Sequence, residues 1–206
     1  MHRPLPAVLS LSVFMFVNVI ANCQSYVGAG FGTFNIPGAT VKFRGFGPSL
    51  RYEYIQENQR ISAYIDVAYL TKSLDGGTAD IYNSSGLPIR SVPTTNKFSY
   101  IYSQLGFKAL LGAEADDRKV IPYIGGGIAV LYRTVRSSYQ TTYNVSDNVD
   151  RSWLYGFHFT AGLQYNFKPV ILELRGNLDI ILKPLVDDNS NILTNLRLSA
   201  IIPISH

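Results

Sequence analysis

Hydrophobic and polar residues alternate for ten or more positions along eight stretches of this 206-residue chain. Such alternation is typical of β-strands with one apolar and one polar face. Strands of this length suit a bilayer-spanning barrel, whose strands need about 9–11 residues. The pattern predicts strands over Tyr26–Asn35, Thr40–Ile55, Arg60–Lys72, Lys97–Gly112, Ile121–Val135, Trp153–Phe167, Val170–Ile181 and Ile192–Ile204.

The two faces of each predicted strand differ in charge. Between Trp153 and Phe167, the apolar face that runs from Tyr155 to Tyr165 carries no charge. We expect the uncharged faces to point outward, toward lipid, and the polar faces to line the interior. The seventh stretch separates the two sets most clearly, with Leu172, Leu174, Leu178 and Ile180 on one face and Glu173, Arg175, Asn177 and Asp179 on the other.

The connections between the predicted strands support the same fold. Short turns follow the second, fourth and sixth strands, whereas long polar loops are expected over 73–96 and 136–150 on the other side. An even number of strands with this asymmetry is typical of outer-membrane barrels. Each unpaired backbone group in lipid costs several kcal/mol, so the sheet is expected to close on itself. The predicted fold class is all-β: a closed, eight-stranded, antiparallel, up-and-down transmembrane β-barrel.

The N-terminus predicts export. Arg3 precedes an apolar run that ends at Ala21, and Asn22 and Cys23 follow. A basic start, a short hydrophobic core and small residues at the exit are typical of a secretory signal peptide. We therefore expect residues 1–23 to be a signal peptide and residues 24–206 to be the barrel domain. A lipidated Cys23 is the alternative.

Composition adds few candidates for chemistry. Cys23 is the only cysteine, so no intramolecular disulfide can form. The formal charge of +4 is spread along the chain without a basic run, which gives no indication of nucleic-acid binding. Glu173 and Asp179 are about 20 Å apart along one strand, too far for joint acid–base catalysis. His158 is expected to be a hydrogen-bonded core residue. No catalytic residue, metal ligand or cofactor is predicted.

Charged residues on the inward faces form the candidate site. Eight strands leave an interior just wide enough for side chains to fill. Isolated buried charges would be very unfavourable, so we expect these groups to pair and to hydrogen-bond across the lumen. The predicted network comprises Arg51, Glu53, Asp66, Lys108, Glu173, Arg175, Asp179 and Arg197.

Three segments carry a resemblance to a known family: 26–32 (YVGAGFG), 122–127 (PYIGGG) and 156–165 (GFHFTAGLQY). With them the chain resembles the small eight-stranded outer-membrane barrels of the OmpA/OmpX type, especially the version common in Bacteroidetes. The resemblance covers the whole mature chain and implies a bacterial outer-membrane location. These motifs are architectural, so they specify the fold and not an activity.

Several functions remain open at the level of sequence. The first is a structural, interaction or adhesion role without enzymatic activity, in which the barrel contacts outer-membrane lipid, the barrel-insertion machinery and an extracellular or envelope protein bound through 73–96 and 136–150. The second is a narrow pore for ions or small solutes. The third is a soluble lipocalin-like barrel, which would need an apolar interior and a polar exterior.

The signal peptide is testable by mass. Ala21 and Cys23 fit the small residues that precede a cleavage site, so the mature protein should begin at Gln24, cyclised to pyroglutamate. Intact mass spectrometry of the purified protein checks this. A mass increment from acyl chains on Cys23 would instead identify a lipoprotein.

Overall fold

The computed structural model describes residues 23–37, 39, 43–56, 60–82, 88–111, 120–140, 147–167, 169–186 and 190–204. The predicted signal peptide, apart from the backbone of Cys23, lies outside these residues. The described residues include no helix that is long and apolar enough to cross a membrane. The strands are β1 (Cys23–Ile36), β2 (Phe43–Gln56), β3 (Ile61–Tyr82), β4 (Pro88–Leu110), β5 (Val120–Tyr139), β6 (Asn148–Phe167), β7 (Val170–Ile181) and β8 (Ile192–Pro203).

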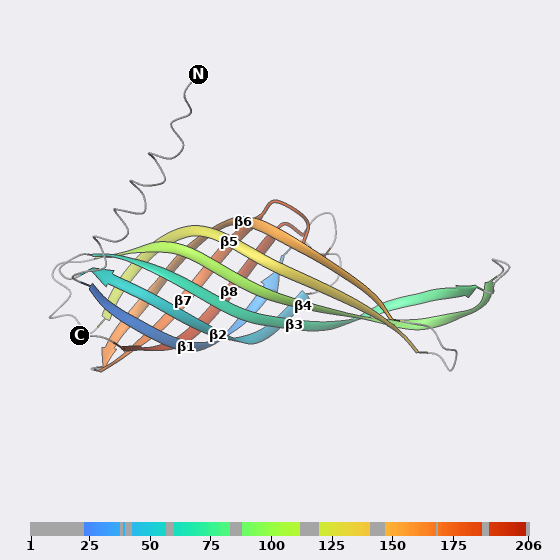
Figure 1. Cartoon of the computed structure of the whole chain (residues 1–206), viewed down its shortest axis with the longest axis horizontal. Coiled ribbons are helices and arrows are strands. Elements are labelled where there is room, and N and C mark those ends of the chain that lie inside the picture. The colour runs from blue at the N-terminus through green and yellow to red at the C-terminus, as the bar shows by residue number, and fades with distance from the viewer. Residues whose placement is uncertain are drawn as a thin grey trace, which may run out of the picture.

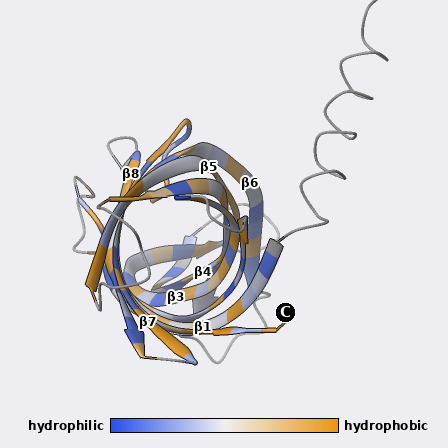
Figure 2. Ribbon diagram, turned by 90° about the vertical axis from the view of Figure 1, so that its left-hand side faces the viewer, coloured by the Kyte–Doolittle hydropathy of each residue, from blue (hydrophilic) through white to orange (hydrophobic). Residues whose placement is uncertain are grey.

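The eight strands form one closed barrel, so the predicted fold is confirmed. Each strand pairs antiparallel with its neighbours in sequence, and β1 pairs with β8 from Tyr26↔Pro203 to Asn35↔Thr194. Figure 2 shows the strands closed into a ring, with hydrophilic and hydrophobic residues alternating along them. Closure gives the strands around the ring a partner on each side, as a hydrocarbon environment demands.

The predicted facing of the strands is also confirmed. On β6, Phe157 and Phe159 are each 54% exposed on the outer wall, whereas His158 between them is 1% exposed. The same alternation runs along β7, where Leu172 and Leu174 point out and Glu173 is buried. A soluble lipocalin-like barrel would require the reverse arrangement, with apolar side chains inside.

The two long polar loops were predicted wrongly. Most of 73–96 continues as strand, and β3 pairs with β4 from Ile61↔Ala109 to Tyr82↔Pro88, with irregularities at Asp75/Thr78 and Ile81/Tyr82. Likewise β5 and β6 take in parts of 136–150 and pair as far as Ser137↔Asn148. Polar residues in these segments hid the strands, because a hairpin surrounded by water does not need an uncharged face.

The long hairpins lie at the end of the barrel opposite the start of β1 and the end of β8 (Figure 1). Figure 1 shows β3 and β4 reaching far beyond the barrel wall, with β5 and β6 beside their base, while β1 begins and β8 ends at the other end. Short turns face the periplasm and longer connections face the outside in outer-membrane barrels. We therefore take the hairpin end as extracellular.

Aromatic residues mark both borders of the apolar outer wall. On β6, Trp153 and Tyr155 point outward at one border and Tyr165 and Phe167 at the other, and all four side chains are exposed. Aromatic girdles at both membrane interfaces are typical of transmembrane barrels. The span from Tyr155 to Tyr165 is about 33 Å of strand, enough for a tilted strand to cross a hydrocarbon layer.

An arginine in the middle of the outer wall should destabilise the barrel. Leu174 lies midway along β7, next to Leu163 and Leu198 on the neighbouring strands, and is 46% exposed. Leu174→Arg should cost about 2–4 kcal/mol, because the charge enters the bilayer midplane. Denaturant titration of the barrel folded into vesicles measures this cost.

The matched control is Leu182→Arg. Leu182 is 66% exposed and lies just beyond the extracellular end of β7, near the membrane border. There the same substitution should cost about 0–1 kcal/mol. Equal stabilities of the two variants would contradict the membrane position of this wall.

Candidate functional site in the barrel lumen

The structure places all eight predicted charged residues inside the barrel, each at most 3% exposed. They come from five strands that surround the lumen. β2 supplies Arg51 and Glu53, β3 supplies Asp66, β4 supplies Lys108, β7 supplies Glu173, Arg175 and Asp179, and β8 supplies Arg197.

One part of the network is built on Lys108. Its Nζ donates to Glu53 Oε2 at 2.8 Å and to Glu173 Oε2 at 3.0 Å, which joins β2, β4 and β7. Arg51 Nη1 donates to Glu173 Oε1 at 2.5 Å. Ser62 Oγ donates to Glu53 at 2.8 Å. The two glutamates thus accept from two cations and a hydroxyl, so their charge is balanced within the lumen.

The other part surrounds Asp66. Arg175 Nη2 donates to its Oδ2 at 2.5 Å, Arg197 Nη1 donates to its Oδ1, and Arg51 Nε lies 3.4 Å from Oδ2. Arg51 therefore links the two parts into one network. The guanidinium of Arg51 also lies over the ring of Tyr64, 4.5 Å from its centroid. Such cation–π contacts stabilise a desolvated cation further.

Asp179 departs from the prediction that every lumen charge is paired. Among the described residues it forms no ion pair; its carboxylate accepts from Gln104 Nε2 at 3.0 Å and from Asn195 Nδ2 at 3.2 Å. Asn177 Nδ2 donates to Asn195 Oδ1 at 2.7 Å in the same group. Asp179 lies four residues from Arg175 on β7, and amide side chains fill the lumen at that level.

His158 lies beside the network as a hydrogen-bonded core residue. Its Nε2 is 2.5 Å from Tyr64 Oη, and its Nδ1 is 3.2 Å from the carbonyl oxygen of Ile128. Glycine is needed beside the ring, because a Cβ on Gly106 would lie 2.8 Å from His158 Cε1. Both ring nitrogens are thus occupied by protein groups, which gives no support for a catalytic base.

The hydrogen bonding of the network is incomplete. Five buried guanidinium nitrogens have no hydrogen-bond partner among the described residues: Arg51 Nε and Nη2, Arg175 Nε and Nη1, and Arg197 Nη2. Unsatisfied buried donors carry a desolvation cost of about 1–3 kcal/mol each, more for charged groups. The network therefore fills the lumen specifically, at a cost in stability relative to an apolar filling.

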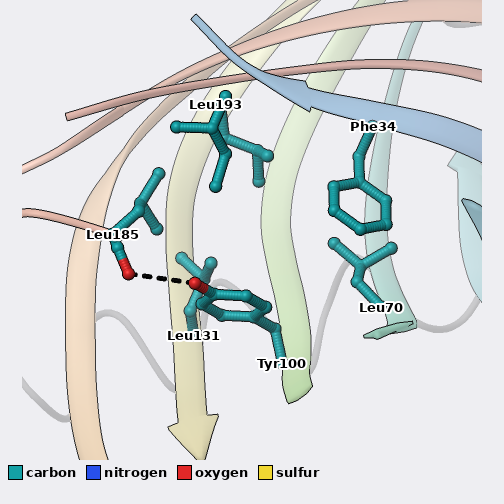
Figure 3. A pocket seen from close by; sticks show the side chains of 7 residues that line it. Phe34, Leu70, Tyr100, Leu131, Leu185 and Leu193 are labelled. Atoms are coloured by element: carbon teal, nitrogen blue, oxygen red, sulfur yellow. Dashed lines mark hydrogen bonds between the residues drawn. The ribbon is translucent and has the colours of Figure 1, made fainter. Parts of the chain in front are cut away.

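The extracellular half of the lumen is apolar, which the sequence analysis missed. Phe34, Leu70, Tyr100, Leu131 and Leu193 converge there from five strands, as Figure 3 shows. The space that they enclose is too small for a water molecule. The sequence contains a sign of this apolar half: near the extracellular ends of the strands the polar alternation is lost, and inward positions such as Leu70 and Leu131 are apolar as well.

A lid closes this apolar half. Leu185, in the part of the connection that directly follows β7, is fully buried against the cluster. Tyr100 Oη donates to the carbonyl oxygen of Leu185 at 2.9 Å, the dashed contact in Figure 3. Arg133 Nη1 donates to the same oxygen at 3.1 Å. Ser190 Oγ accepts from the backbone nitrogen of Val186 at 2.7 Å. The lid is therefore held by both apolar burial and hydrogen bonds.

The described residues contain no group of three or more His, Cys, Asp or Glu side chains that could hold a metal ion. The carboxylates of the lumen are instead engaged by cations and amides. The arrangement is that of a filled interior, polar toward the periplasm and apolar toward the outside.

Comparisons with known proteins agree with this architecture. No protein-family model matches the chain, and no curated protein matches it. Neisserial surface protein A matches with a TM-score of 0.58 at 16% identity, covering 87% of this chain and 97% of that chain. A major outer membrane protein from Thermus thermophilus matches with a TM-score of 0.59 at 13% identity, covering 88% of this chain and 99% of that chain.

A third solved structure is Ail, the attachment invasion locus protein of Yersinia pestis, in complex with the heparin analogue sucrose octasulfate. It matches with a TM-score of 0.55 at 12% identity and covers 89% of this chain and 99% of that chain. Identities this low establish the fold alone. The closed ring, the apolar outer wall and these likenesses define the class: the protein has the fold of the small eight-stranded outer-membrane β-barrels.

Removing one member of the network should destabilise the barrel more than removing an exposed ion pair. Lys108→Met leaves Glu53 and Glu173 without their shared cation, which should cost about 3–5 kcal/mol. The double variant Lys108→Met, Glu53→Gln should recover part of that loss, because one buried carboxylate is neutralised as well. Denaturant titration in vesicles measures both variants.

Arg136→Ala is the control. Arg136 Nε lies 2.6 Å from Asp147 Oδ2, and the side chain of Arg136 is 61% exposed. Removing this exposed pair should cost about 0–1 kcal/mol. If Lys108→Met were as stable as Arg136→Ala, the ion pairs of the lumen would not contribute as described.

Proposed function

We propose that this protein is a non-conducting outer-membrane barrel without enzymatic activity that presents its β3–β4 hairpin outside the cell as an interaction surface. The observation that carries the proposal is the filled lumen. Lys108, Arg51 and Arg175 cross-link the strands in one half, and Leu185 closes the other half. A barrel whose lumen is filled in this way is expected to function through the surface that it exposes outside the cell.

The displayed part is a sheet with free edges. The register between β2 and β3 runs from Ile55↔Ser62 to Ser49↔Ala68, and Gly47 of β2 still lies against the backbone of Tyr69; farther out, among the described residues, β3 is paired with β4 alone. An exposed strand edge offers unpaired backbone groups to another chain. The name of Ail, attachment invasion locus protein, gives a precedent for an interaction role on this fold.

The filled lumen predicts that the barrel does not conduct ions. In planar bilayers the parent should give no steady conductance, because the ion-pair network fills one half of the lumen and the apolar cluster with Leu185 fills the other. Insertion must be verified independently, for example by protease protection of the reconstituted barrel. Large, steady currents from the inserted parent would favour the narrow pore instead.

The interaction role is tested by shortening the hairpin. Asp75 and Thr95 face each other in the register, so residues 76–94 can be replaced by an Asn-Gly turn that leaves the transmembrane wall intact. Bacteria that display the parent should adhere to cultured animal cells or to one another more than bacteria that display the shortened barrel at equal surface level. Equal adhesion in both assays would leave only a structural role.

A further inference from the structure

The outer wall changes character just beyond the extracellular aromatic border on β3–β6. In the register, Tyr69, Ile101, Tyr132 and Trp153 lie side by side across these four strands. The rings of Tyr132 and Trp153 are in contact, with centroids 4.8 Å apart. Aromatic residues of this kind sit at the headgroup level of a membrane.

Three cations lie on the same outward face in the next two rows. Arg151 lies opposite Thr134 in the first row, and Arg136 lies opposite Lys97 in the second. Directly opposite residues are about 4.5–5.5 Å apart and diagonal neighbours about 7–8 Å apart, so the three side chains can reach one ligand group. All three side chains are exposed. Thr71, Ser99 and Thr134 lie in the first row with Arg151, and Ser73 lies in the second row with Lys97 and Arg136.

The positive charge of this patch is only partly balanced. Arg136 pairs with Asp147 at 2.6 Å, whereas Lys97 and Arg151 have no carboxylate within 4 Å among the described residues. Asp150 is held by Arg133 Nη2 at 3.3 Å. Three cations thus share one carboxylate on a surface that borders the membrane.

The depth of the patch fits lipid headgroups. Arg151 is two residues beyond Trp153, and Lys97 is four residues beyond Ile101 on its strand, which corresponds to about 7 and 13 Å along the strands. The headgroup region extends about 5–7 Å from the hydrocarbon, and long basic side chains reach back toward it. We propose that Lys97, Arg136 and Arg151 form a binding site for the phosphate groups of anionic lipids in the outer leaflet.

The chain carries its own reporter for this site. Trp153 is the only tryptophan, and it lies two residues from Arg151 on the same face. The barrel is reconstituted in phosphatidylcholine vesicles that contain a small fraction of brominated lipid, either phosphatidylglycerol or phosphatidylcholine, with bromine near the glycerol end of the acyl chain. At equal mole fraction, the anionic lipid should quench Trp153 at least about twofold more strongly, because cations concentrate anionic lipid around the reporter.

The triple variant Lys97→Gln, Arg136→Gln, Arg151→Gln should lose this excess quenching. Arg60→Gln, which removes an exposed cation at the opposite end of the barrel, should keep it. Circular dichroism verifies that each variant is folded. Equal quenching by the two lipids in the parent, or unchanged excess in the triple variant, would overturn the site.

Two further outcomes are distinct. If inorganic phosphate removed the excess quenching and sodium chloride of equal ionic strength did not, the site would bind a soluble anion and the lipid assignment would fall. If neither brominated lipid quenched Trp153, the membrane position of this wall would be wrong, and the proposal would fall with it.

Discussion

The requirement that backbone polar groups be satisfied within the hydrocarbon layer governs this structure. A sheet in lipid cannot leave an open edge, so β1 must pair with β8 and the eight strands must close. Closure in turn creates an interior from which lipid and bulk water are both excluded. Polar side chains that the alternation points inward depend on partners there: Arg51 pairs with Glu173 and Lys108 with Glu53 across the lumen, while five guanidinium nitrogens have no hydrogen-bond partner among the described residues.

The two halves of the lumen are filled by different kinds of side chain. Toward the periplasm, Asp66 and Glu173 each pair with cations from three strands, which ties distant parts of the wall together. Toward the outside, the strands supply apolar side chains, and the lid with Leu185 completes their burial. Both halves of the lumen are thus filled by side chains of the barrel itself.

Outside the membrane the same constraint disappears, and the strands behave differently. β3 and β4 continue into water, where backbone groups at a free edge can be hydrated and polar residues are tolerated on both faces. The boundary between the two regimes is visible on the outer wall, where Tyr132 and Trp153 give way to Arg136 and Arg151. The surrounding medium, lipid or water, thus determines whether both edges of a strand must be paired and whether its outward residues are apolar or charged.

The sequence by itself determined the number of strands, their facing and the eight charged lumen residues, because alternation with period two directly reports which medium each face meets. It misjudged the hairpins, since strands in water lack that signal. Only the tertiary structure decided which charges meet: Asp66 collects arginines from β2, β7 and β8, while Asp179 is bound by amides. Register and barrel closure bring residues together across the lumen, and the burial of Leu185 depends on the shape of a cluster drawn from several strands.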